Sequence, residues 1–319
     1  MKPFARINLS SVALRRGILV PSLVLIVLWS TKGRAEIQTW DCGAITNTVT
    51  ATLDTDTGVF NISGTGTMKD YVWKDPWYVP VPRDPVPWAP SRKSVKSVVI
   101  GPGVASIGES AFCHCEALTS VRIPDSVTSI GDGAFFACFA LSSLTIPSNV
   151  TSIGKGAFNY CVSMSSVTIP DGITTLPNNV FDGCRMLTAI DIPASVTNIG
   201  EHAFARCYAL TEVTIPAGVA FIDSYAFYDC KALADVYCWP DPAKLTWGEY
   251  AWIDFMREGI KTRCHVNAEH LDAYKTKFTG NVNVVFIGDL SDRTIIIPCA
   301  RVEILSRKER KGYKERNRA

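Results

Sequence analysis

The chain has 319 residues, and its composition, 47% hydrophobic and 19% charged, is that of a folded protein. This composition excludes a chain that is disordered over its whole length. Beyond the first apolar run, no stretch holds the roughly 20 apolar residues that a membrane span needs. Residues 1–35 carry six basic residues and no acid, and residues 301–319 have net charge +5, which leaves −9 for residues 36–300. This acidic body disfavours a nucleic-acid partner, which requires a basic face.

Residues 1–35 have the parts of a secretory signal peptide. Basic residues precede the apolar run from Ile18 to Trp29, and Gly33 and Ala35 supply the small residues of a cleavage site. An uncleaved signal anchor is the alternative, but the apolar run is short for a membrane span. The sequence therefore predicts an exported chain, secreted or displayed at the cell surface, with no transmembrane span in its mature form.

Residues 36–94 are predicted to form an amino-terminal β cap. Alternation of apolar and polar residues over 44–52 and 59–63, around a turn at Asp54–Gly58, indicates a β-hairpin. Such a cap would cover the open end of a stack, which otherwise exposes strand edges.

A segment rich in proline and aromatic residues closes this region. It contains Trp73, Trp77, Tyr78 and Trp88, and proline favours an extended course. Exposed aromatic rings could bind a partner. We favour the alternative of a lid on the stack, because a cap must bury its own aromatic side chains.

Residues 95–241 contain a repeat of 23 residues with the pattern V-x-x-I-G-x-x-A-F-x-x-C-x-x-L-x-x-V-x-I-P-x-x. Six copies begin at Val104, Val127, Val150, Ile173, Val196 and Val219. One column of the repeat is Phe112, Phe135, Phe158, Phe181, Phe204 and Phe227. A second column is Cys115, Cys138, Cys161, Cys184, Cys207 and Cys230. A strict period of this length is typical of a solenoid.

Each repeat is predicted to hold one short strand, because L-x-x-V-x-I alternates and the following Pro cannot donate to a ladder. The strands are expected at 119–123, 142–146, 165–169, 188–192, 211–215 and 234–238. A-F-x-x-C fits a short turn of α-helix or 3₁₀ helix. One repeat cannot bury its Phe, Leu and Ile alone, so neighbouring repeats must stack. The predicted fold is a β-rich solenoid with one short parallel strand and one short helical turn per repeat, capped at both ends.

The unit Val127-Thr-Ser-Ile-Gly-Asp-Gly-Ala-Phe-Phe-Ala-Cys-Phe-Ala-Leu-Ser-Ser-Leu-Thr-Ile-Pro147 resembles the leucine-rich repeats of the BspA-like class of bacterial surface and secreted proteins. The segment from Ile62 to Met68 resembles the amino-terminal cap of that class, and the segment from Cys264 to Tyr274 its carboxyl-terminal cap. Asn267 stands where that cap usually has Pro. The resemblance implies export, surface display and binding of host or bacterial partners without catalysis.

Residues 242–290 are predicted to form a carboxyl-terminal cap, with a helix over 268–278 and a strand over 282–287. Residues 291–319 form a basic tail that is expected to be disordered beyond Val302. Binding of this tail to acidic polymers or membrane headgroups is the alternative.

No motif for catalysis or for a cofactor is present. Asp54-x-Asp56-x-Gly58 begins like a calcium loop, but Thr65 stands where such a loop needs a bidentate Glu. Cys113-His114-Cys115 lacks a second pair at zinc-finger spacing. We therefore expect no enzyme activity, no cofactor and no metal.

The cysteines of an exported chain would ordinarily indicate a framework of disulfide bonds. Aligned side chains on successive coils stand about 4.8 Å apart, which is too far for a disulfide, so the Cys column is expected to hold buried free thiols. Cys238 and Cys264 lie outside the column, and they are our candidate pair for a disulfide.

The binding surface is expected on the side chains that the strands turn outward. Acid and an aromatic ring gather in the second half of the repeats, where binding hot spots are most plausible. The predicted partner-binding residues are Arg122, Asp191, Glu212, Asp235 and Tyr237. A merely solvated strand face is the alternative.

The predicted function is an exported leucine-rich-repeat protein that binds or adheres to a macromolecule, either a protein or a surface glycan. A structural envelope protein that self-associates through its repeats is the second hypothesis. An enzyme is a distant third, because no convergent ionisable groups are evident.

Overall fold

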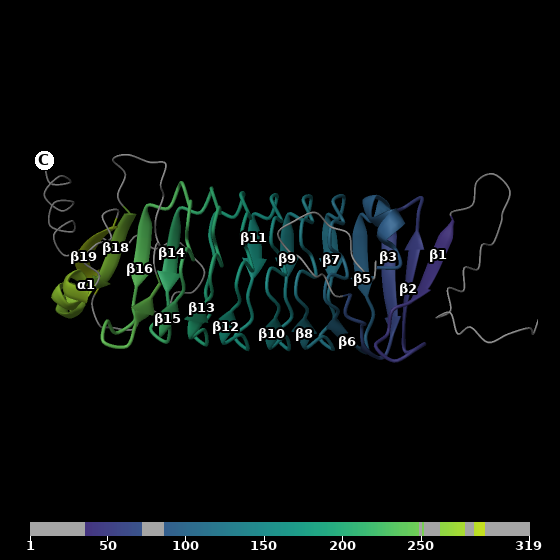
Figure 1. Ribbon diagram of the computed structural model, residues 1–319, viewed down its shortest axis with the longest axis horizontal. Coiled ribbons are helices and arrows are strands. Elements are labelled where there is room, and N and C mark those ends of the chain that lie inside the picture. Colours follow the sequence, from purple (N-terminus) through teal and green to yellow (C-terminus); the bar gives the residue numbers. More distant parts are fainter. Residues whose placement is uncertain (1–35, 72–85, 249–250, 252–261, 278–283, 291–319) are drawn as a thin grey trace, which may run out of the picture.

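The structure is a computed structural model that describes residues 36–71, 86–248, 251, 262–277 and 284–290. The predicted signal peptide over 1–35 and the basic tail over 291–319 lie outside these residues, as do Trp73, Trp77 and Tyr78. The described part is an elongated stack of coils in which equivalent strands of successive coils lie side by side (Figure 1). The fold class predicted from the repeat is therefore confirmed.

Most coils contribute two short strands, which corrects the expectation of one strand per repeat (Figure 1). The first row is β5 (Ser97–Ile100), β7 (Ser120–Arg122), β9 (Ser143–Thr145), β11 (Ser166–Thr168), β14 (Glu212–Ile215) and β16 (Asp235–Cys238). The second row is β6 (Val104–Ile107), β8 (Ser129–Ile130), β10 (Ser152–Ile153), β12 (Thr175–Leu176), β13 (Asn198–Ile199), β15 (Phe221–Ile222) and β17 (Thr246–Trp247). The V-x-x-I segment forms this second row because its backbone groups also need partners, and the next coil supplies them.

Pairing within both rows is parallel and moves by one repeat at a time. Ser143 pairs with Ser166 in the first row, and Ser129 pairs with Ser152 in the second. Because the step equals the sequence period, each side chain stacks on its counterpart in the next coil. The repeat thus becomes a set of columns that run along the stack.

The first row is interrupted at the expected strand over 188–192, where the structure has no strand. Ala189 and Asp191 occupy the outward positions that Ser and Thr hold in β9 and β11, and both residue types are poor strand formers. Ile190 and Ile192 remain buried in the core. The expectation of a regular strand is therefore wrong here, although the inward side chains keep their places.

The A-F-x-x-C segments of successive coils form one side of the stack, which we call the turn wall. Each segment is a run of turns and not the expected turn of α-helix or 3₁₀ helix. Two residues of each coil, four positions apart, have positive φ angles, such as His202 at 56° and Arg206 at 57°. A left-handed residue interrupts a right-handed helix and costs about 1–2 kcal/mol. Hydrogen bonds between coils offset this cost; Phe112 N, for example, donates to Ala134 O at 2.8 Å.

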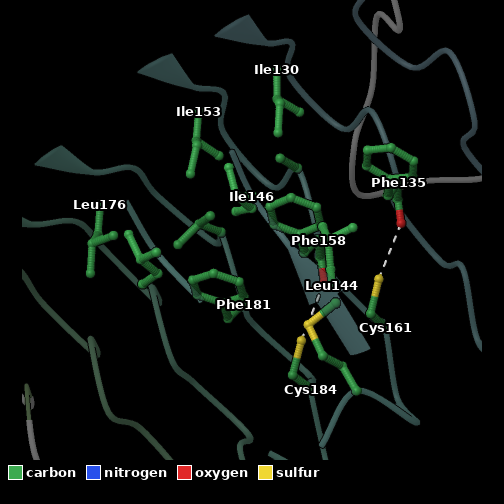
Figure 2. Packing of buried hydrophobic residues seen from close by; sticks show 14 of the residues in the cluster. Ile130, Phe135, Leu144, Ile146, Ile153, Phe158, Cys161, Leu176, Phe181 and Cys184 are labelled. Carbon is green, nitrogen blue, oxygen red and sulfur yellow. Dashed lines mark hydrogen bonds between the residues drawn. The ribbon is translucent and has the colours of Figure 1, made fainter. Parts of the chain in front are cut away.

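The Phe column forms the centre of the core. All six rings are buried, with centroids of adjacent rings 5.2–5.7 Å apart and ring planes within 8–16° of parallel. Figure 2 shows three of them, Phe135, Phe158 and Phe181. These separations exceed the spacing of about 4.8 Å between strands because the rings are offset, as stacked aromatic pairs prefer.

The Cys column ties each coil to the one before it. The Cys138 thiol donates to Phe112 O at 3.1 Å. The Cys161 thiol donates to Phe135 O at 3.3 Å (Figure 2). Cys184, Cys207 and Cys230 make the same contact. Burial raises the pKa of Cys161 to about 12, so this thiol stays protonated and able to donate. Every cysteine of the described residues is a free thiol.

The amino-terminal end of the stack is antiparallel. β1 (Ile37–Asp41) pairs with β2 (Val49–Asp54), and β2 forms the expected hairpin with β3 (Val59–Gly64). β3 then pairs in parallel with β5, and β4 (Gly66–Thr67) pairs with β6. We propose that these strands cap the stack, because they cover the first coil.

Trp88 lies just before the short 3₁₀ helix η1 (Ala89–Ser94) and is fully buried. Its ring packs against Phe60 and Phe112, and its Nε1 donates to Ala111 O at 2.9 Å. For this residue the lid interpretation holds, because the ring is not available to a partner.

The carboxyl-terminal end continues the first row through β18 (Thr262–Asn267) and β19 (Val284–Leu290), both parallel to β16. Between these strands lie the 3₁₀ helix η2 (Ala268–His270) and α1 (Leu271–Lys277). The expected helix and strand are thus present with shifted bounds. Asn267 caps η2, because its side chain accepts from Glu269 N, and Tyr274 donates to Pro240 O at 2.6 Å.

Asp182 is a fully buried acid in the turn wall. Arg206 of the next coil forms a salt bridge with it, with Nε donating to Oδ1 at 3.0 Å, and the guanidinium lies 5.5 Å from the centre of the Tyr160 ring. Burial raises the pKa of Asp182 to about 6, and Arg206 opposes this rise without cancelling it.

Phe158→Ala should destabilise the chain by about 3–5 kcal/mol, because it opens a cavity between two stacked rings. Denaturant unfolding followed by circular dichroism measures this loss. Thr168→Ala, on the exposed face of β11, is the control and should change stability by less than about 0.5 kcal/mol. An unchanged unfolding midpoint for Phe158→Ala would contradict the stacked core.

Asp182 should make stability depend on pH in an unusual direction. Its pKa is 3.8 before burial and about 6 in the fold, so between these values the unfolded chain loses the proton first. Its contribution to the free energy of unfolding therefore falls as pH rises through this window.

The measurement is calorimetry of the parent chain and Asp182→Asn at several pH values. We expect the Tm of the parent minus that of the variant to decrease from pH 4 to pH 6.5. An increase would mean that Arg206 outweighs burial and lowers the pKa of Asp182.

Candidate binding surface

The strands β14 and β16 turn alternate side chains inward and outward. Val213 and Val236 are buried, whereas Glu212 is exposed and Asp235 and Tyr237 are half-buried on the outer face. The register pairs Glu212 with Asp235 on neighbouring strands. A charged and aromatic outer face is thus built on a regular parallel ladder.

Of the predicted partner-binding residues, the structure brings together Glu212, Asp235 and Tyr237. Asp191 is exposed one repeat before Thr214, in the interrupted part of the first row. Arg122 lies on β7, five repeats before Tyr237, which places it roughly 24 Å away at about 4.8 Å per coil. It does not belong to the same surface.

Asp235 is the centre of a network that joins three strands. Arg263 on β18 donates to it from Nε at 2.6 Å and from Nη2 at 2.5 Å. His265 Nε2 lies 2.9 Å from Asp235 Oδ1, and His265 Nδ1 lies 2.8 Å from Asp289 Oδ2 on β19. We call Glu212, Asp235, Tyr237, Arg263, His265 and Asp289 the carboxyl-terminal face.

The network keeps Asp235 charged and fixes the geometry of its members. Partial burial would raise the pKa of Asp235, but hydrogen bonds from Arg263 and His265 outweigh it and hold this pKa below its usual value. Partial burial, together with nearby carboxylates, raises the pKa of Tyr237. The Tyr237 ring stacks on His265 with centroids 4.8 Å apart. Asp235 is therefore an ionised, already paired acid and not a free one.

Sequence reasoning missed Arg263, His265 and Asp289. The repeat period is lost after β16, because 28 residues separate Asp235 from Arg263 where the repeat would place 23. Strand alternation was the available signal: Cys264 and Val266 are buried, which turns Arg263 and His265 outward. These two residues continue the columns of Asp235 and Tyr237.

The calcium-like and zinc-like segments have structural roles. Asp54 Oδ1 accepts from Asp56 N at 3.0 Å and from Thr57 N at 3.1 Å, which orders the hairpin turn. Cys113 and Cys115 are buried. Within the part of the chain that the structure describes, no three His, Cys, Asp or Glu side chains are grouped to hold a metal ion.

Cys238 and Cys264 lie on the adjacent strands β16 and β18, both turned into the core. The register pairs Cys264 with Val236 and Cys238 with Val266, so the two cysteines are diagonal neighbours. A hydrogen bond to Cys238, with burial, raises the pKa of the Cys264 thiol. Both are free thiols in this structure.

None of the helices in the described residues is long and apolar enough to cross a membrane.

Residues 92–239 match the family model of the BspA type leucine rich repeat region in six copies. Among solved structures, a leucine-rich repeat protein from Eubacterium ventriosum ATCC 27560 is 22% identical, with coverage of 64% of this chain and 73% of that chain and a TM-score of 0.31. A leucine rich cell surface protein from Faecalibacterium prausnitzii A2-165 is 22% identical, with coverage of 76% and 94% and a TM-score of 0.35. The pneumococcal vaccine antigen PcpA is 12% identical, with coverage of 78% and 100% and a TM-score of 0.38.

No curated protein matches the chain. The pattern of the repeats, their stacking at a spacing of 23 residues and the match in six copies all lead to one assignment. The repeats of this chain belong to the BspA-type leucine-rich repeat family.

Proposed function

We propose that this chain is an exported leucine-rich-repeat binding protein, secreted or held at the cell surface, that recognises a macromolecular partner and performs no chemistry of its own. The carboxyl-terminal face is the proposed contact surface. The signal-peptide pattern of residues 1–35 supports export. A similar protein from Faecalibacterium prausnitzii is described as a cell surface protein, which agrees with this location.

The observation that carries the proposal is the ordering of large polar side chains on the outer face. Arg263 is held by two hydrogen bonds to Asp235, and Tyr237 is held by its stack on His265. Side chains fixed before binding lose little conformational entropy on contact with a partner. Tyr and Arg are also the residue types that dominate binding hot spots.

Charge indicates the partner's chemistry. The face carries the carboxylates of Glu212, Asp235 and Asp289 against the cation of Arg263 and the imidazole of His265, and Asp191 lies nearby. Because Asp235 is already paired, Glu212 and Asp191 are the acids that a partner would meet. A protein or glycan that presents basic groups fits this surface, and a nucleic acid does not.

The test is a capture experiment with the exported chain against host matrix and bacterial surface fractions, repeated with Glu212→Gln/Tyr237→Ser. We expect this double variant to lose at least tenfold in affinity for the captured partner, because it removes a free acid and an aromatic anchor. Asp235 is left unchanged, because its replacement would remove the acceptor of both Arg263 hydrogen bonds. The association rate of the parent chain should fall as salt rises.

The matched control is Ser166→Ala/Thr168→Ala, which changes the same two columns on β11. It should bind like the parent. Full affinity of Glu212→Gln/Tyr237→Ser would exclude the carboxyl-terminal face. Concentration-dependent oligomers of the chain without any captured partner would favour the structural, self-associating hypothesis.

We also propose that Cys238 and Cys264 form a disulfide once the chain meets an oxidising compartment, in which two thiols give up two protons and two electrons to an oxidant such as glutathione disulfide. Mass spectrometry of an unreduced digest should then show the linked peptides. The six-Cys column should stay reduced in the same sample, because the side chains of successive coils run parallel. Linked peptides within the column would contradict this assignment.

A further inference from the structure

A groove of about 330 Å³ runs along the turn wall, away from the strand rows that form the proposed contact surface. It extends from Glu109 in the first repeat to Glu201 in the fifth, four steps of 23 residues, or roughly 19 Å at about 4.8 Å per coil. Between these ends the groove is lined by residues that include Asp132, Phe136, Lys155, Asn159 and Asn179. A groove of this shape accommodates a linear ligand laid along the solenoid.

Small residues open the groove and large ones close it. One column with positive φ holds Gly133 and Gly156 within the groove but His202 and Tyr225 in the following coils. A Cβ built at Gly156 would make an ordinary van der Waals contact with the Cβ of Asn159, at 3.6 Å, so a side chain can begin there without a clash. His202 and Tyr225 stack with centroids 5.0 Å apart. Their rings occupy the equivalent space beyond the groove.

Two amide oxygens in the groove have no partner among the described residues. Asn159 is only 4% exposed, and its Oδ1 is buried without a hydrogen bond; Asn179 Oδ1 is in the same state. A buried acceptor without a donor is costly, so such atoms in a native fold call for an explanation. A ligand that donates hydrogen bonds into the groove supplies one.

The remaining groups limit the ligand's charge. Glu109, Asp132 and Glu201 are acidic against the single cation of Lys155, which disfavours an anionic ligand. Asp132 already accepts from Lys155 N at 2.7 Å. The half-buried ring of Phe136 offers an apolar surface beside the amides. The free acceptors are thus neutral amides next to an aromatic ring.

We infer that this groove binds a short, linear, uncharged oligosaccharide. Sugar hydroxyls both donate and accept, so they can satisfy Asn159 and Asn179 and also accept from Lys155. The apolar face of a sugar ring can pack on Phe136. An extended peptide is the alternative occupant, and the titration below tests it. This site is independent of the proposed function, since it shares no residue with the carboxyl-terminal face.

The test is calorimetric titration of the full chain with cellotetraose, mannotetraose and the tetramer of N-acetylglucosamine. At least one should bind. Asn159→Leu should weaken that binding roughly tenfold or more, because it removes the acceptor. Gly156→Tyr should abolish it by filling the groove, and the fold tolerates Tyr at this column because Tyr225 has φ of 59° there.

Stability separates a lost site from a lost fold. Asn159→Leu replaces an unpartnered buried amide by an apolar group, so its unfolding midpoint should equal or exceed that of the parent. Asn198→Leu, exposed on β13, is the matched control and should bind like the parent. A chain that binds none of the neutral tetrasaccharides overturns the proposal. The proposal is also overturned if both groove variants bind the tetrasaccharide as tightly as the parent chain does. Binding only of a lysine-rich hexapeptide, or only of an anionic hyaluronan tetrasaccharide, would overturn it as well.

Discussion

The stack of Phe rings, together with the hydrogen bonds from the Cys thiols to the Phe backbone carbonyls, is the interaction on which the rest of this structure depends. Each buried thiol donates to the carbonyl of the Phe in the preceding coil, and the rings themselves stack along the axis. Ring stacking requires a constant number of residues from one Phe to the next. The thiol bond requires a constant number from each Phe to the Cys of the following coil. The 23-residue period is therefore a packing constraint, and both strand rows take their register from it.

Much of the fold can be predicted from this period. The columns of Phe and Cys identify the core, and the alternation around Val236 and Cys238 identifies which side chains face outward. Periodicity could not reveal the second strand row, because V-x-x-I has too few residues to alternate. The left-handed residues of the turn wall were also hidden, since His202 and Arg206 are not residue types that demand positive φ.

The candidate sites were predicted only in part, for a related reason. Glu212, Asp235 and Tyr237 were found because they lie in repeating columns, whereas Arg263 and His265 lie after an irregular coil. From the sequence, Asp235 was expected to be a free acid, but its pairing with Arg263 makes it the centre of a network of hydrogen bonds. The groove escaped prediction altogether, because an unsatisfied amide such as Asn159 can be recognised only once its surroundings are known. The same column constraint thus supports two different surfaces, an ordered charged face on the strands and a groove with unpartnered amide oxygens on the turns.

Hydrogen exchange in a core variant tests most directly whether the Phe and Cys columns hold the coils together. The amide protons of Phe135 and Phe181 bond to the next coil, to Ala157 and Ala203, and report on the coils on either side of Phe158. If the columns couple the coils, Phe158→Ala should lower the protection of both amides as well as that of its own coil. Loss of protection confined to residues of the mutated coil would show that the coils are stable independently and would contradict the account.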